Sequence, residues 1–310
     1  MLNSINIIKC VAIIWVTNQH VMQRVVDDSS YTFFLHPIGV ELFFAVSGYL
    51  TLRWFDAKHS ANFVETGCAF FLTRVTRIYP LTFISLILCL FILEENSFDP
   101  ISVFFLSLSL DPFEKYGNPV LWSLNVEIYF YLFCLVFFSI AKSKKIYLLS
   151  LLVISVIGQS LSILIFEYFI YFLVGGILFY SSAKILPFFS IKSFPLFVIT
   201  IFVVIITIYL ININLLITNL ILVTYIFLFI QENHTFFKRL KLIEWLGKYC
   251  FTIYLFHIPI LWIIEPIYYL GWLTIFFLVI LFCALITPLE FYLEKMRFNL
   301  KSKYVSAQLK

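Results

Sequence analysis

One stretch of the chain, residues 193–231, contains no charged residue at all. A helix crosses the hydrocarbon core of a bilayer with about 20 mostly apolar residues, so this stretch suits two crossings rather than one. The polar Asn212 and Asn214 mark the predicted turn between them. Charged residues make up 12% of the chain, against about 25% in soluble proteins. The chain is therefore predicted to be a polytopic membrane protein, which excludes a soluble secreted domain, a disordered chain and a nucleic-acid-binding protein.

The same criterion of length predicts an all-α membrane bundle of about ten transmembrane helices in a single domain, residues 1–310, with no separate soluble domain. The apolar segment 101–110 is too short to cross, so we predict a re-entrant or interfacial piece there. The predicted spans are residues 4–21, 34–52, 78–93, 119–141, 146–166, 168–183, two within 193–231, 245–264 and 266–289.

Basic residues gather in every second loop between these spans. Arg74 and Arg77 precede the third span, the lysines of 142–145 follow the fourth, and further basic residues fill the C-terminal tail. Positively charged loops remain on the cytoplasmic side of a membrane. Both termini are therefore predicted to be cytoplasmic.

The six cysteines are scattered and show no CxxC spacing, so we predict neither a disulfide framework nor a metal site. The N-terminal apolar stretch contains Lys9 and lacks a small-residue cleavage site, so the first helix is expected to remain in the mature protein.

Two ionisable residues lie inside the first predicted span, where a charge is costly and suggests function. Lys9 and His20 are eleven positions apart. That spacing is about 20° beyond three helical turns, so both side chains share one face, about 16 Å apart along the axis. A buried histidine is often only a hydrogen-bonded structural residue, but neutral imidazole can also accept a proton in a reaction. Both interpretations are open on this feature alone.

Glu127 lies inside the fourth predicted span, at the end of the sequence Trp122-Ser123-Leu124-Asn125-Val126-Glu127. Counting inward from the outer end of the span places it in the same outer half of the membrane as His20. A carboxylate beside an imidazole can orient the ring and stabilise its protonated form. The alternative is a hydrogen bond that only holds two helices together.

Three further features are candidates for a role in packing or function. His257 follows Tyr254 by one turn in the ninth predicted span, so both side chains face the same way. The pair Ser47-Gly48 is interpreted as a small-residue packing notch in the second span. Arg74 and Arg77 either orient the third span or bind an anionic ligand from the cytoplasm.

Five short motifs occur in order along nearly the whole chain. They are the basic residue and histidine of the first helix, Val40–Leu50 with Glu41 where aspartate is common, R-x-x-R-x-Y-P at Arg74–Pro80, W-S-L-x-x-E at Trp122–Glu127, and Gly247–His257. The last is similar to G-x-x-S-Y-x-x-Y-L-x-H, with Cys250 in place of serine and Phe256 in place of tryptophan. Each motif is weak alone. Together they resemble the acyltransferase 3 family, membrane-bound acyltransferases that modify bacterial surface polysaccharides among other acceptors.

The resemblance implies a membrane-bound O-acyltransferase in a bacterial cytoplasmic membrane, with acetyl-CoA as the expected donor and no permanently bound cofactor or metal. The expected acceptor is a sugar hydroxyl of a surface polysaccharide or its lipid-linked precursor, and the oligomeric state is left open. His20 is expected to be catalytic, as general base or acyl carrier, with Glu127 orienting it. Lys9, Arg74 and Arg77 are expected to handle the donor. The residues expected to contact the substrate or to support the catalytic residues are Ser47, Tyr79, Trp122, Ser123, Tyr254 and His257.

Two other classes of function are alternatives to an acyltransferase. A transporter or flippase for a lipid-linked sugar or an acyl group would also place charges inside a ten-helix bundle, but the sequence has no obvious inverted repeat. A purely structural membrane protein leaves the buried lysine, glutamate and histidine unexplained. Release of CoA distinguishes the enzyme from the flippase.

Overall fold

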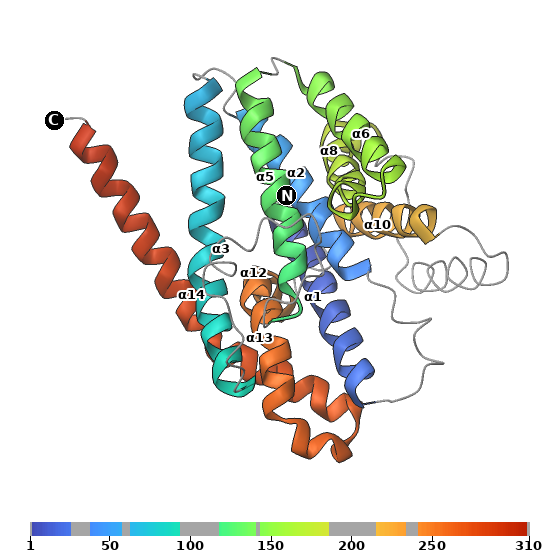
Figure 1. The fold of residues 1–310 in the computed structure, drawn as a ribbon, viewed down its shortest axis with the longest axis vertical. Coiled ribbons are helices and arrows are strands. Elements are labelled where there is room, and N and C mark those ends of the chain that lie inside the picture. The colour runs from blue at the N-terminus through green and yellow to red at the C-terminus, as the bar shows by residue number, and fades with distance from the viewer. Residues whose placement is uncertain are drawn as a thin grey trace. The chain divides into compact units, whose positions relative to one another are not determined.

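The computed structural model describes residues 2–25, 38–57, 63–93, 118–140, 143–185, 215–233 and 241–308. Every regular element within these ranges is a helix (Figure 1), so the predicted all-α fold is confirmed for the part of the chain described. The chain forms two compact units. The first comprises residues 1–19, 33–63 and 140–250, and the second comprises residues 20–32, 64–139 and 251–310.

Four described helical stretches are long and apolar enough to cross a membrane: Ser4–Val25, Ile38–Ala57, Gly67–Ile92 and Trp272–Met296. A fifth is added if the broken pair Lys241–Lys248 and Cys250–Ile263 forms one span. The predicted count of ten goes beyond these and stays a prediction. The predicted re-entrant segment 101–110 and the first part of the uncharged run, up to residue 214, lie outside the described residues.

The first unit is built on α2 (Ile38–Ala57), a helix that is buried along most of its length. Around it the unit contains most of α1 (Leu2–Val25), α6 (Lys144–Ser160), α7 (Leu164–Glu167), α8 (Phe169–Ile185), α10 (Leu215–Glu232) and α12 (Lys241–Lys248).

Glycines allow α2 and α8 to approach each other backbone to backbone. A Cβ atom at Gly48 would overlap the carbonyl of Phe172, and one at Gly175 would overlap the carbonyl of Ala45. Small residues permit this close approach between membrane helices. The interpretation of Gly48 as a packing notch is therefore confirmed.

A buried polar contact joins α2 to α10 in the same unit. The Asn219 side chain donates a 2.7 Å hydrogen bond to Glu41 Oε1, and both residues are almost completely buried. Tyr49 packs nearby between two rings, with centroids 5.3 Å from Phe179 and 5.3 Å from Phe227. Because buried polar groups need partners, the amide satisfies one oxygen of the acidic residue of the second-helix motif.

The second unit contains α3 (Phe63–Leu93) and α13 (Cys250–Ile263) without their first residues, α5 (Leu121–Ile140) without its last, the 3₁₀-helix η3 (Glu265–Leu270) and α14 (Trp272–Gln308). Contacts at both ends show that α3 and α5 run antiparallel (Figure 1). The rings of Phe70 and Tyr131 lie 5.6 Å apart at one end. At the other, the Asn118 side chain lies 3.4 Å from Ser85 Oγ.

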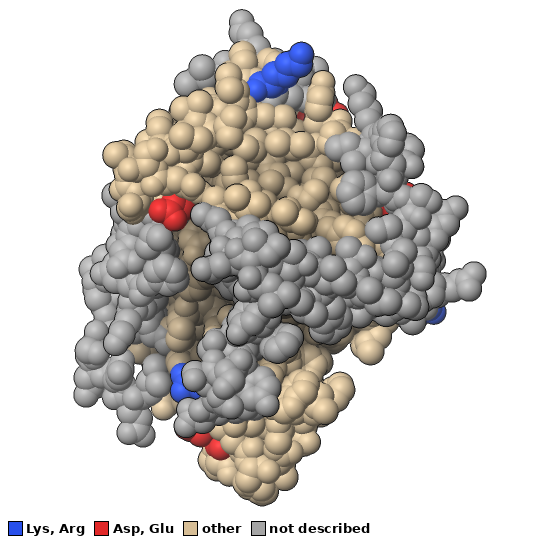
Figure 2. All heavy atoms as spheres, turned by 90° about the vertical axis from the view of Figure 1, so that its right-hand side faces the viewer, with Lys and Arg blue, Asp and Glu red and all other residues tan. Residues whose placement is uncertain are grey.

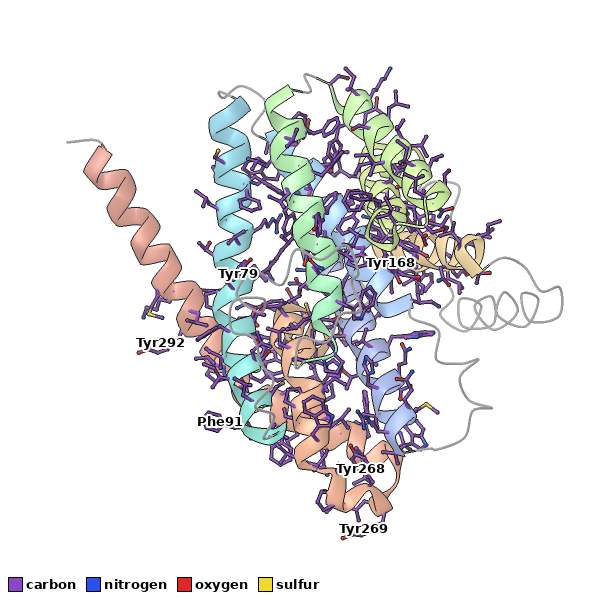
Figure 3. All side chains as sticks on the ribbon, in the orientation of Figure 1. Tyr79, Phe91, Tyr168, Tyr268, Tyr269 and Tyr292 are labelled. Atoms are coloured by element: carbon purple, nitrogen blue, oxygen red, sulfur yellow. The ribbon has the colours of Figure 1, made fainter. Side chains whose placement is uncertain are left out.

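The outward side of α14 is apolar, as expected of a helix in contact with lipid. Its exposed side chains recur mostly every fourth residue, which places them on one face: Leu273, Phe277, Leu281, Leu285, Tyr292 and Met296. Figure 3 shows Tyr292 on the outside of α14 and Phe91 on the outside of α3. On the face drawn in Figure 2, few charged side chains interrupt the described surface. Exposed apolar area of this extent is natural in hydrocarbon and unfavourable in water.

A proline lies inside the apolar part of α14 without interrupting the helix. Pro288 has no backbone N–H, so the Ala284 carbonyl, four residues earlier, loses its helical hydrogen bond. The Thr287 hydroxyl donates a 2.8 Å hydrogen bond to that carbonyl. The side chain thus satisfies a group that lipid could not.

The helices differ from the predicted spans at three places. Helix α3 begins at Phe63, well before the span predicted from residue 78, because a helix can extend beyond the apolar segment. The ninth span, predicted as 245–264, is two helices, which end at Lys248 and begin again at Cys250. The tenth, predicted as 266–289, starts as a 3₁₀-helix and is interrupted at Gly271, whose φ of 81° is a conformation that suits glycine.

Candidate functional site

Three buried polar residues of α13 contact side chains of neighbouring helices. Thr252, Tyr254 and His257 are all buried, and each lies close to a side chain of a different neighbouring helix. The partners are Glu290 on α14, Ser123 on α5 and His20 at the end of α1. Two motifs that lie far apart in the sequence, W-S-L-x-x-E and the late histidine motif, thus meet at one helix.

The two histidines predicted at the site form a pair. Their ring centroids are 5.2 Å apart and the rings are tilted by 36°. His257 is fully buried, and its Nδ1 lies 2.7 Å from the Tyr254 carbonyl and 3.2 Å from the Ile253 carbonyl. His20 is half-buried, and its side chain hydrogen-bonds to Gln23, one turn further along α1. The structure therefore brings a second imidazole to the predicted catalytic residue.

Tyr254 and Ser123 connect α13 to the start of α5. The Tyr254 hydroxyl lies 2.8 Å from the Val120 carbonyl and 2.7 Å from Ser123 Oγ. The Val120 carbonyl accepts from the Tyr254 hydroxyl, and the Ser123 hydroxyl lies 3.3 Å from the same carbonyl. Together with the hydrogen bond between the two hydroxyls, these contacts fix both side chains.

Asn118 is a structural residue of the site that the sequence analysis missed. It is fully buried, and its side-chain amide donates a 2.9 Å hydrogen bond to the Leu255 carbonyl on α13. That carbonyl is available because Pro259, four residues later, has no N–H to offer it. The signals in the sequence were Asn118 beside a proline at the start of an apolar helix, and a proline within another.

Replacing Asn118 with alanine should destabilise the protein, because the Leu255 carbonyl would then be buried without a donor. An unsatisfied buried group of this kind costs about 1–3 kcal/mol. Thermal unfolding in detergent measures the effect. The matched control is the same change in a Pro259→Ala background, where residue 259 regains an N–H for Leu255. Equal losses in both backgrounds would contradict this role for the amide.

Arg74 and Glu127, two of the predicted site residues, share a neighbour on α5. The Arg74 guanidinium lies 5.2 Å from the centre of the Phe70 ring and 5.7 Å from that of Tyr131. The Tyr131 hydroxyl in turn donates to Glu127 Oε1. A guanidinium over aromatic faces is held by cation–π attraction. Tyr131 therefore contacts both the guanidinium of Arg74 and the carboxylate of Glu127.

Glu290 is a second residue that the sequence analysis missed. It is buried in α14, accepts a 2.5 Å hydrogen bond from Thr252 Oγ1, and interacts electrostatically with Arg77. Its predicted position was just outside the tenth span. The buried residues of α14 recur at Ile275, Val279 and Cys283, and Glu290 continues that face, which only the structure reveals.

The remaining predicted residues are distributed over both units. Lys9 and Ser47 belong to the first unit, where both are half-buried. Tyr79 on α3 (Figure 3) and Trp122 on α5 are half-buried in the second. Within the described ranges, no group of three or more His, Cys, Asp or Glu side chains is placed to hold a metal ion.

Comparison with known proteins gives one match. A family model for acyltransferase 3, described as an acyltransferase domain, matches residues 2–290. This range includes all five motifs and every residue of the site discussed above. No curated protein and no solved structure matches the chain.

Proposed function

Because the chain belongs to the acyltransferase 3 family, we propose that it is an O-acetyltransferase that moves an acetyl group from cytosolic acetyl-CoA to a sugar hydroxyl. The acceptor is part of a cell-surface polysaccharide or its lipid-linked precursor. The enzyme lies in the cytoplasmic membrane of a bacterium, with about ten spans and both termini in the cytoplasm. The basic loops and the uncharged runs of the sequence support this topology.

The polar cluster at α13 is the observation that carries the proposal. A thioester is already activated, so the reaction chiefly requires a deprotonated acceptor held in the right place. His20 takes the proton of the sugar hydroxyl as its oxygen attacks the acetyl carbon. The C–S bond then breaks, and the proton passes to the leaving thiolate. The half-buried imidazole of His20, beside the second imidazole of His257, supports this role.

Glu127 is proposed to orient the general base. Its predicted depth, in the same outer half of the membrane as His20, motivates this role. The hydrogen bond from the Tyr131 hydroxyl to Oε1 holds this carboxylate in a defined orientation. Ser123, Tyr254 and Trp122 are proposed to shape the acceptor side of the site.

The family motifs support a role for Lys9, Arg74 and Arg77 in handling the donor. Tyr79 and Ser47, from the same motifs, are proposed to contact the substrate or to support these residues. The phosphates of CoA carry several negative charges, and cationic residues at the inner mouth of a bundle attract such a ligand. The Arg74 guanidinium is already held over two aromatic rings, so less side-chain entropy is lost when it binds a phosphate.

Neutralising Arg74 should raise the KM for acetyl-CoA about tenfold with a smaller effect on kcat. A charge-assisted hydrogen bond contributes about 1.5–3 kcal/mol, and about 1.4 kcal/mol is a factor of ten. Steady-state kinetics of Arg74→Gln in detergent checks this. Thr76→Ala, an exposed position on the same helix, is the matched control and should keep the wild-type KM. An unchanged KM in Arg74→Gln would remove this arginine from the donor site. Arg77→Lys should also be impaired if its contact is bidentate.

The proposed function is tested by release of CoA. Purified protein in lipid nanodiscs is given acetyl-CoA with and without membrane glycans, and free thiol is followed over time. Acceptor-dependent release, together with acetyl groups found on the glycan by mass spectrometry, supports the enzyme. Movement of a lipid-linked sugar across vesicles without any CoA release would identify a flippase instead.

A further inference from the structure

His257 carries a buried nitrogen with no hydrogen-bond partner. The residue is fully buried in α13, and its Nε2 lacks any partner among the described residues. Buried polar atoms in native structures are nearly always paired, so an orphan requires an explanation. The ring in contact with it on another helix is that of His20.

The backbone of α13 determines which nitrogen of His257 carries the proton. Nδ1 lies 2.7 Å from the Tyr254 carbonyl and 3.2 Å from the Ile253 carbonyl, and carbonyl oxygens only accept. Nδ1 must therefore be the donor. In a neutral imidazole the other nitrogen then has no proton and presents a lone pair. The helix thus holds His257 in one tautomer with its acceptor nitrogen unused.

This lone pair suits the needs of a general base next to it. A histidine that accepts a proton on one nitrogen carries an N–H on the other, and in catalytic triads an acceptor holds that N–H and sets the ring orientation. The two rings are adjacent, with centroids 5.2 Å apart, but no hydrogen bond joins them in the structure. A rotation of the His20 side chain is needed to bring its N–H to the distance of about 2.9 Å that such a bond spans. In the structure His20 is hydrogen-bonded to Gln23 on its own helix.

We propose that His257 is a second positioning residue of the reaction, in addition to Glu127: its Nε2 accepts the N–H of His20 and holds that ring in the tautomer that faces the acceptor hydroxyl. This role rests on the proposed acyl transfer. When His20 takes the hydroxyl proton, the resulting imidazolium is stabilised by the lone pair of a neutral neighbour. His257 takes no proton from the substrate. The proton that His20 accepts from the hydroxyl still passes to the thiolate of CoA.

The test compares two substitutions of His257. Phenylalanine keeps a buried ring against His20 and Tyr254 but removes the acceptor nitrogen, whereas glutamine offers an acceptor oxygen. We expect His257→Phe to lower kcat roughly 10- to 100-fold, less than the 10²–10⁴ of a general base itself, with an unchanged KM for acetyl-CoA. His257→Gln should recover part of the rate. Cys283→Ala, which removes a thiol packed 3.9 Å from the Ile253 carbonyl, is the packing control and should keep wild-type kcat.

Nitrogen-15 NMR of histidine-labelled protein provides a readout that does not depend on activity. The expected result is a His257 ring protonated at Nδ1 and unprotonated at Nε2, assigned by the signal that disappears in either variant. A proton on Nε2, or wild-type kcat in His257→Phe, would overturn the proposal. If the wild-type protein itself releases no CoA, the proposed function fails, and the NMR result still decides the tautomer.

Discussion

Replacing His20 with alanine should lower acetyl transfer by a factor of 10²–10⁴, the usual contribution of a general base. The expectation follows from the position of this imidazole, half-buried at the end of α1 and paired with His257. Transfer of labelled acetyl from acetyl-CoA to glycans in isolated membranes measures it. The rate of the wild-type enzyme should also fall at acidic pH, because a protonated imidazole cannot accept the hydroxyl proton.

The control for this variant is Ile14→Ala on the same helix, where the side chain is exposed and apolar. It should retain activity at a similar protein level. Full activity in His20→Ala at a normal level would refute the catalytic role. Labelled acetyl-CoA without acceptor separates two routes: label held on His20 as a competent intermediate indicates an acyl-enzyme, and its absence fits direct transfer, which we favour.

The second large effect concerns folding rather than chemistry. Gly175→Ala should sharply reduce the amount of folded protein, because the new Cβ would overlap the backbone carbonyl of Ala45 on α2. Neither backbone can move aside without separating two buried helices. Overpacking of this kind costs typically about 1–3 kcal/mol and occasionally more, out of a total stability of about 5–15 kcal/mol. The yield of monodisperse protein in detergent and its melting temperature report the loss.

The adjacent residue is a matched control. A Cβ at Gly176 would meet the end of the Leu148 side chain at 2.8 Å and otherwise only Leu52 at 3.8 Å. The end of a leucine can rotate away, whereas a carbonyl in a helix cannot. Gly176→Ala should therefore be much less harmful than Gly175→Ala. Equal yields for the two variants would contradict the close packing of α2 and α8.

Helix positions followed from the sequence where the apolar pattern coincides with the helix itself. The predicted first, second and fourth spans fall on α1, α2 and α5. The predicted bounds of the spans were less accurate where a charged residue does not mark the end of a helix. Arg74 and Arg77 were taken as the boundary of a span, yet α3 continues through them because a helix needs backbone hydrogen bonds and not an apolar surface.

The sequence was enough to predict which residues belong to the site, but not which of them contact each other. His20, Glu127 and His257 stand out because an ionisable group inside an apolar span is rare. The pairing of His257 with His20, and of Tyr254 with Ser123, joins segments that no local pattern relates. Asn118 and Glu290 were missed because their polar character is ordinary in sequence and becomes informative only once both are seen to be buried.

The hydrogen bond between Asn118 and the Leu255 carbonyl has a consequence for how this sequence can change over generations. A lineage that loses Asn118 first must pass through a form in which a buried carbonyl has no donor. A lineage that loses Pro259 first restores the helical N–H, after which an apolar residue at position 118 no longer leaves that carbonyl without a donor. We therefore expect replacements to occur in a preferred order, with the proline lost before the asparagine in descendants that lack both.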